Sequence, residues 1–81
     1  MRVSAVIPAL DEEGTIAAVV RAIPAHLVSE IIVVDNGSTD QTAARAREAG
    51  ARVVRQPLRG YGRACKAGVE AVSPLADVVV F

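Results

Sequence analysis

The sequence predicts an α/β fold, in which one doubly wound parallel sheet carries helices on both faces. Four short apolar segments alternate with three segments of helical periodicity, an alternation typical of parallel sheets with crossover helices. The strand candidates are apolar on both faces, which favours a sheet that is covered on both sides. Glycines and charged residues gather after the strands, at the edge where such sheets bind ligands. The length suits a single small domain spanning residues 1–81.

The first strand and helix are predicted from an apolar run and a helical period. The strand is expected over Val3–Ile7 and to end at Pro8, because proline cannot donate to a central ladder. The helix that follows is expected to end near Pro24. Its buried face is predicted from the i, i+3, i+4, i+7 spacing of Ile16, Val19, Val20 and Ile23.

The second strand and helix carry the clearest signals. Glu30–Asp35 is a strand candidate whose four central residues are all β-branched and apolar. Ser38 and Gln41 have the capping-box spacing that opens a helix. Gly50 is a natural stop at the end of that helix.

The rest of the sequence predicts a strand, a helix and a final strand. The third strand is expected over Arg52–Arg55 and the fourth over Asp77–Phe81. The helix between them is expected to end before Pro74. Its buried face is predicted from the helical spacing of Cys65, Gly68, Val69 and Val72.

Charge and cysteine content exclude several classes of function. The formal net charge is zero, so no overall field attracts nucleic acid, and no nucleic-acid partner is expected. Cys65 is the only cysteine, which excludes a disulfide framework and a zinc cluster within the chain. One unpaired thiol, with no signal or membrane-spanning stretch, favours a cytoplasmic protein. Any membrane association is expected to come from a longer parent chain.

The loop after the first strand contains three consecutive acids, Asp11, Glu12 and Glu13. The helix dipole favours a carboxylate before a helix by about 0.3–1 kcal/mol. The acids therefore fit two interpretations, a capped helix start or a set of ligand contacts. The residues alone leave both open.

Asp35 ends the buried second strand. A carboxylate in this position needs a hydrogen-bond partner, because its desolvation is costly. One candidate partner is an N–H on the edge of a nucleobase, which uracil or guanine would supply. The other is the set of backbone amides across Gly37 and Ser38. We favour the nucleobase, and the second interpretation remains open.

The loop before the third helix combines glycines with basic residues. Gly60 and Gly62 allow backbone N–H groups to approach an anion closely. Positive charge for phosphate groups comes from Arg59, Arg63 and Lys66. The pattern does not complete a dinucleotide-binding fingerprint, because a cysteine stands where the third glycine belongs. A mobile basic loop without a ligand is the alternative.

Three blocks of this sequence resemble the inverting family 2 glycosyltransferases of the GT-A fold, and the resemblance covers the whole chain. The blocks are VIPALDEE (6–13), IVVDNGSTD (32–40) and GYGRA (60–64). The branch that they resemble most contains the dolichyl- and polyprenyl-phosphate sugar transferases. The resemblance implies the strand order 3-2-1-4 and a site for a nucleotide-diphosphate sugar, with UDP and GDP as the candidate nucleotides.

The resemblance also implies roles for individual residues. Main chain and apolar contacts of residues 8–10 would line the base, Glu12 would bond the ribose hydroxyls, and Asp35 would bond the base edge. The third loop would lie near the base or the diphosphate. The donor-binding residues implied in this way are Pro8, Ala9, Leu10, Glu12, Asp35, Gly37, Gly60, Gly62 and Arg63. No catalytic residue is assigned.

In this family the fourth strand leads into an Asp-x-Asp motif that binds Mg²⁺ or Mn²⁺ on the diphosphate, and the catalytic base comes later. The sequence ends at Phe81, where that motif should begin. Metal ligands are therefore not expected among these residues, and the 81-residue chain is expected to be inactive by itself. For a longer parent protein, the resemblance implies transfer of the sugar to a polyprenyl phosphate or to a different acceptor molecule. The fourth strand is expected to be an unprotected edge that favours self-association.

Two other interpretations are less favoured. A sugar-phosphate nucleotidyltransferase has a similar nucleotide-binding half, but it would carry a glycine-rich basic loop where this chain has acids. A non-catalytic α/β nucleotide-binding or interaction module is the alternative from outside the enzymes. Measured nucleotide binding distinguishes a donor site from an interaction module.

Overall fold

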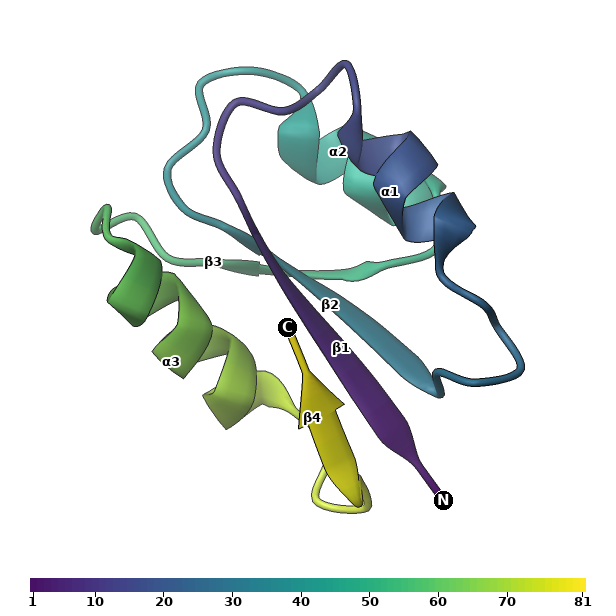
Figure 1. Ribbon diagram of the computed structural model, residues 1–81. Helices are drawn as coiled ribbons and strands as arrows, with labels where there is room; N and C mark the ends of the chain where they lie inside the picture. The colour runs from purple at the N-terminus through teal and green to yellow at the C-terminus, as the bar shows by residue number, and fades with distance from the viewer.

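The computed structural model describes all 81 residues and shows a four-stranded parallel sheet between two helical layers (Figure 1). The strand order is β3-β2-β1-β4, which confirms the predicted doubly wound arrangement. None of the three helices is long and apolar enough to cross a membrane. The elements are β1 (Val3–Ala9), α1 (Ile16–Ala22), β2 (Glu30–Asp35), α2 (Thr42–Glu48), β3 (Arg52–Arg55), α3 (Tyr61–Ala71) and β4 (Val78–Val80).

Strand β1 continues through Pro8 to Ala9, two residues beyond the predicted end. Its pairing with β2 runs as far as Ala9 and Asp35, whereas its pairing with β4 stops at Ala5. Ala9 accepts a hydrogen bond from the backbone of Asn36 on the β2 side. Because neighbouring residues in a parallel strand bond to opposite sides, Pro8 faces the side where β4 has already ended. The missing proline N–H therefore costs no ladder bond.

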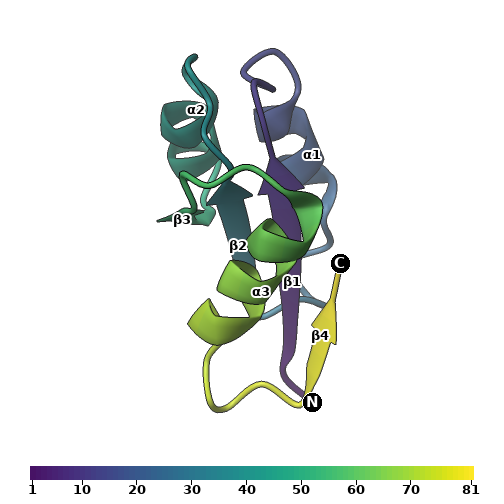
Figure 2. The same ribbon diagram turned by 90° about the vertical axis from the view of Figure 1, so that its left-hand side faces the viewer.

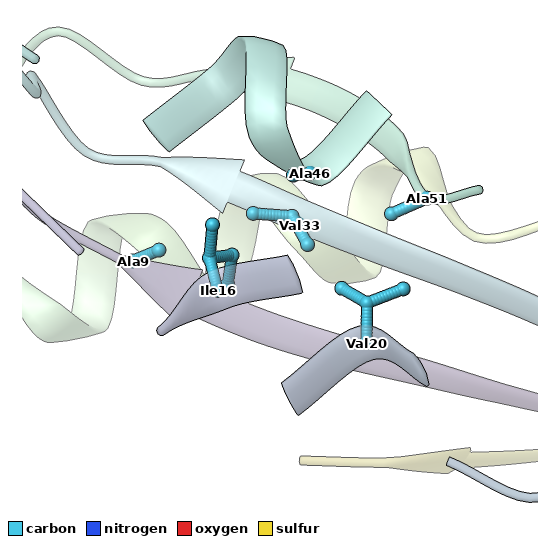
Figure 3. Close-up of a cluster of buried hydrophobic side chains, with 6 residues drawn as sticks. All are labelled: Ala9, Ile16, Val20, Val33, Ala46 and Ala51. Carbon is cyan, nitrogen blue, oxygen red and sulfur yellow. The ribbon is translucent and has the colours of Figure 1, made fainter. Parts of the chain in front are cut away.

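The two faces of the sheet have separate cores. Helices α1 and α2 cover one face, where Figure 3 shows their side chains meeting Val33 of β2. Helix α3 covers the opposite face, as the turned view in Figure 2 shows, against Ile32 and Val34 of the same strand. The alternation of Ile32, Val33 and Val34 follows from the two-residue period of a strand. The buried residues of the first core are Ala9, Ile16, Val20, Val33, Ala46 and Ala51.

The predicted buried face of α3 was partly wrong. Val69 is 48% exposed and Cys65 is only half-buried, while Ala64 and Gly68 are the buried residues of this helix. The contact with the sheet is made by small side chains, because a Cβ at Gly68 would lie 2.2 Å from Cγ1 of Val6. The helix lies too close to the sheet for a face of large apolar residues.

Helix α2 does not begin with the predicted capping box. It starts at Thr42, and the residue before it, Gln41, makes no side-chain cap. The Ser38 hydroxyl instead accepts a hydrogen bond from the backbone N–H of Asp11. The predicted stop is confirmed, since Gly50 follows the helix with φ of 105°, a conformation that favours glycine.

At the amino-terminal end of the sheet, the Glu30 side chain of β2 contacts β1, the segment after α3, and β3. Its carboxylate accepts hydrogen bonds from the Ser4 hydroxyl at 2.7 Å and from the Ser73 backbone N–H at 3.1 Å. Arg52 Nη1 lies 3.5 Å from Glu30 Oε1 and forms an ion pair with it. Strand β4 is shorter than predicted, at three residues. This network holds the end of the sheet opposite to the loops that carry the candidate site.

Candidate functional site

A cavity of about 280 Å³ opens at the carboxyl ends of β1 and β2. The three loops that follow β1, β2 and β3 lie together at this end of the sheet (Figures 1 and 2). This is the edge at which open α/β sheets bind ligands, next to the point where the strand order reverses. The cavity is lined by Pro8, Ala9, Leu10, Glu12, Asn36, Arg59, Gly60 and Tyr61.

Two of the three acids in the first loop bind the second loop. The backbone N–H of Asp11 donates to Ser38 Oγ at 2.9 Å, and the Asp11 carboxylate accepts from the Thr39 N–H at 2.8 Å. These contacts hold Asp11 in a left-handed conformation with φ of 51°, which is uncommon outside glycine but tolerated by aspartate. The bend turns the chain from the end of β1 toward α1.

Glu13 forms a second reciprocal pair with the same loop. Its backbone N–H donates to Asp40 Oδ2 at 3.2 Å, and its own Oε2 accepts from the Gln41 N–H at 3.0 Å. Asp40 also accepts from the hydroxyl of Thr42, and this bond is the main reason that the pKa of Asp40 lies below its ordinary value. Asp11 and Glu13 therefore have a structural role before α1 that is more specific than a helix start. Each acid connects the first loop to the second through a pair of reciprocal hydrogen bonds.

Glu12 differs from its two neighbours. Its backbone N–H donates to the hydroxyl of the buried Thr42 at 2.8 Å, which fixes the main chain. Its carboxylate makes no hydrogen bond within the protein, and Glu12 is one of the residues that line the cavity. Glu12 is therefore the one acid of this loop that is free to accept hydrogen bonds from a bound molecule.

Asn36 connects the second loop to the third. It is 6% exposed, and its Nδ2 donates to the carbonyl oxygens of Gln56 at 2.8 Å and Leu58 at 2.9 Å. Its Oδ1 accepts from the backbone N–H of Gly60 at 3.0 Å. Gly60 has φ of 145°, in the region that favours glycine, at the point where the loop enters α3.

Asp35 is placed differently from the ligand contact that we favoured. It is 3% exposed and does not line the cavity, and its Oδ1 accepts a hydrogen bond from the Ser38 N–H at 3.0 Å. That bond is the local backbone contact of the alternative interpretation. Oδ2 has no protein partner in the structure, so one carboxylate oxygen of Asp35 remains unused.

Five of the nine sequence-predicted binding residues line the cavity, namely Pro8, Ala9, Leu10, Glu12 and Gly60. Gly37, Gly62 and Arg63 lie outside its lining, as Asp35 does. Arg63 donates to the carbonyl oxygen of Arg59 at 3.1 Å and borders a neighbouring hollow with Lys66. The binding roles of all nine residues stay predictions.

Sequence reasoning missed Asn36 and Tyr61, and it considered Arg59 only as one of several basic residues. Tyr61 stands between the two glycines of the third block and is 72% exposed at the cavity. A hydrogen bond with Cys65 raises the pKa of Tyr61 above its ordinary value. The signal that could have identified Tyr61 was its isolation as the only tyrosine, inside a block already selected for its glycines.

No group of three or more histidine, cysteine, aspartate or glutamate side chains is arranged to hold a metal ion. The carboxylates of Asp11, Glu13 and Asp35 are instead engaged with backbone N–H groups. The residues present thus do not fit a divalent ion. What the cavity offers is an apolar wall, one free carboxylate and one guanidinium.

Comparison with known proteins decides the family. The family described as Glycosyl transferase family 2 matches residues 4–81. The chain belongs to this family. An uncharacterised glycosyltransferase of Mycobacterium bovis is 47% identical over 78 residues, which cover 95% of this chain and 35% of that relative. A glucosyl-3-phosphoglycerate synthase of Mycolicibacterium paratuberculosis is 46% identical over 90 residues, covering 98% of this chain and 27% of that relative. The chain thus spans about a third or less of these glycosyltransferases.

Solved structures support the fold at high similarity. A mycobacterial protein matches with a TM-score of 0.86 and 45% identity over 99% of this chain and 30% of its own. The glucosyl-3-phosphoglycerate synthase of Mycobacterium tuberculosis in complex with UDP matches with a TM-score of 0.84 and 43% identity, over 96% of this chain and 31% of its own. That enzyme has also been solved with Mg²⁺ and UDP, and with Mn²⁺, UDP-glucose and phosphoglyceric acid. The polyprenyl-phosphate branch receives no support from these relatives.

Proposed function

We propose that this family 2 glycosyltransferase chain binds the nucleotide of a UDP-sugar donor, as part of an inverting transferase. The observation that carries the proposal is the cavity at the carboxyl ends of β1 and β2, where Glu12 presents the only unengaged carboxylate of the acidic loop. The choice of UDP over GDP is supported by the UDP complex of a 43% identical synthase.

Each wall of the cavity suits one part of the nucleotide. The main chain and apolar side chains of residues 8–10 suit the flat face of a base. The Glu12 carboxylate would accept hydrogen bonds from the ribose hydroxyls, and Arg59 would neutralise part of the diphosphate charge. Asp35 is proposed as a base contact only through Oδ2, because Oδ1 already accepts the Ser38 N–H.

The 81 residues are assigned donor binding and orientation alone. They contain no set of side chains that fits the divalent ion found in related synthases, and no catalytic base is assigned among them. Holding the nucleotide in one orientation is nevertheless part of the catalysis of a transferase, because it removes freedom from the reacting sugar before the chemical step.

For the whole protein we infer transfer of a sugar to a phosphoglycerate-type acceptor. The support comes from the names of relatives that are 44–46% identical over 98% of this chain, and from a related structure that holds UDP-glucose and phosphoglyceric acid together. A cytoplasmic location and self-association through β4 stay predictions. The comparisons lend neither of them support, although Val78 and Val80 on β4 are exposed.

The experiment is an amide NMR titration of the chain with UDP and, separately, with GDP. Shifts at residues 8–12 and 59–61 with UDP, and smaller ones with GDP, are expected. Glu12→Gln should weaken UDP binding by about fivefold to tenfold, because a neutral amide is a poorer acceptor for two hydroxyl groups. Glu48→Gln is the matched control, since it removes the same charge from an exposed position on α2.

Two results would contradict the proposal. Absence of shifts at millimolar UDP, in a chain whose spectrum shows that it is folded, would favour an interaction module instead. Equal binding by the wild type and Glu12→Gln, with shifts elsewhere on the surface, would place the nucleotide outside this cavity.

A further inference from the structure

One wall of the cavity is formed by Arg59, Gly60 and Tyr61. The loop that contains these residues is held by a single side chain from the loop after β2, that of Asn36. Residues 57–61 are exposed and contain no regular structure until α3 begins at Tyr61. Within this stretch, Arg59, Gly60 and Tyr61 face the cavity. The backbone of β2 reaches this loop only at its start, where the Gln56 N–H donates to the Asp35 carbonyl at 2.9 Å. Beyond that point, the hydrogen bonds that connect the loop to the sheet come from the Asn36 side chain.

The Asn36 amide is almost fully used by these contacts. A carboxamide has two N–H donors and one carbonyl oxygen with two lone pairs. Both donors go to carbonyl oxygens of the loop, and the oxygen accepts the Gly60 N–H. The Asn36 backbone N–H is also engaged, with the carbonyl oxygen of Ala9 at 2.9 Å. Asn36 therefore connects Ala9, in the first loop's wall of the cavity, with Gly60 in the wall formed by the third loop. It has little hydrogen-bonding capacity left for a ligand.

We propose that Asn36 is a positioning residue for nucleotide binding, which holds the segment from Arg59 to Tyr61 against the cavity. The inference rests on the proposed function, since it concerns the same nucleotide site. Asn36 acts through the loop and not by direct contact with the nucleotide. Its amide fits because two neighbouring carbonyl oxygens need donors and one N–H needs an acceptor, a combination that a carboxylate cannot provide.

A first measurement needs no variant. The side-chain amide protons of Asn36 should exchange with solvent more slowly than those of Gln41, whose side chain is exposed. In the absence of nucleotide, the Gly60 N–H should also be protected, because Asn36 Oδ1 accepts it. Exchange of the Asn36 amide protons as fast as that of Gln41 would overturn the proposal, whatever the chain binds.

Two variants then test the effect on binding. Asn36→Ala removes all three side-chain hydrogen bonds, and Asn36→Asp keeps an acceptor for Gly60 but places a carboxylate beside two carbonyl oxygens. Both should weaken UDP binding by about fivefold or more, and Asn36→Ala should speed exchange at Gly60 by about tenfold. Ser4→Ala is the control, because it removes a hydrogen bond of a buried side chain at the opposite end of the sheet.

The outcomes separate the two proposals. If the wild type does not bind UDP, the proposed function fails. If the wild type binds UDP and both folded Asn36 variants bind it within about twofold of the wild type, the positioning role is wrong. Loss of binding in Asn36→Ala with unchanged exchange at Gly60 would mean that Asn36 contacts the nucleotide directly, which would also overturn the positioning role. Ser4→Ala should lose stability and keep the wild-type affinity.

Discussion

Gly68 of α3 lies directly against Val6 of β1. A Cβ added at position 68 would come within 2.2 Å of Val6 Cγ1 and 3.1 Å of Val34 Cγ2. Real Cβ atoms do not make contacts as short as the first of these. The absence of a side chain at this position therefore sets how closely α3 approaches the sheet. Helix α3 begins at Tyr61, which lines the cavity.

Gly68→Ala should destabilise the protein, by about 1–3 kcal/mol from overpacking, reduced by the gain of about 1 kcal/mol that alanine gives in a helix. Both neighbours are β-branched valines in the sheet, which have few rotamers with which to yield. Gly62→Ala is the control on the same helix, because nothing lies within 4 Å of its added Cβ, and it should stabilise slightly. Urea unfolding measures both. Equal stability of the two variants would mean that α3 can shift away from the sheet at little cost.

The layers of this fold could be predicted from the residue pattern and its strand order from the family resemblance, whereas the face of α3 could not be predicted. The strands of a parallel sheet are apolar on both sides, as Ile32, Val33 and Val34 are, so their pattern is visible in the sequence. Helical periodicity gives weight to large apolar residues such as Val69. The contact with the sheet instead selects small ones, because its distance is set by the atoms at Gly68.

The residues of the candidate site were likewise predicted only in part. Glu12 was identified from a local block, and its free carboxylate is consistent with that prediction. Asn36 was missed because its partners are 20 to 24 residues away in the sequence. The spacing of a motif says nothing about such contacts. For Asp35, desolvation correctly required a partner, but the sequence could not decide between a ligand and the nearby Ser38 N–H.

The contribution of Glu30 to stability should depend on pH. The Ser4 hydroxyl, together with the Ser73 N–H and Arg52, holds the pKa of Glu30 below its ordinary value of 4.5, and burial opposes this effect. Because the folded-state pKa is the lower one, the ionised form stabilises the fold. This stability is present above pH 4.5 and is lost as the pH falls through the folded-state pKa.

Glu30→Gln tests this dependence by urea unfolding at pH 7 and at pH 3. The variant should be less stable than the wild type at pH 7, and the difference should shrink at pH 3, because the contribution of the ionised carboxylate is lost as the pH falls below 4.5. The exposed Glu48→Gln serves as the control, with little difference from the wild type expected at either pH. A difference between Glu30→Gln and the wild type that stays constant with pH would show that packing, and not charge, is what Glu30 contributes.

Thr42→Val should damage both stability and nucleotide binding. The Thr42 hydroxyl is buried, accepts the Glu12 N–H at 2.8 Å and donates to Asp40. Removing it leaves the partly buried Glu12 N–H without this partner, and the loss of the bond costs about 1 kcal/mol. It also frees the main chain that presents the Glu12 carboxylate to the cavity. Thr42→Ser keeps the hydroxyl and should retain UDP affinity, although it loses some stability with the methyl group. Equal UDP affinity in the folded valine variant would show that the position of Glu12 does not depend on this bond.

Arg59→Gln should weaken the binding of UDP and leave the binding of uridine unchanged. Arg59 is an exposed cation at the cavity, and its guanidinium is engaged in no ion pair within the protein. A charged donor is expected to matter for a diphosphate, by about threefold to tenfold in affinity at low salt, and not for a neutral nucleoside. The loss should shrink as salt is added, because an exposed charge is screened. Arg47→Gln on the exposed surface of α2 controls for the change in net charge. If Arg59→Gln weakened uridine and UDP equally, Arg59 would act on the base or on the loop itself. The diphosphate would then have to lie along another wall of the cavity.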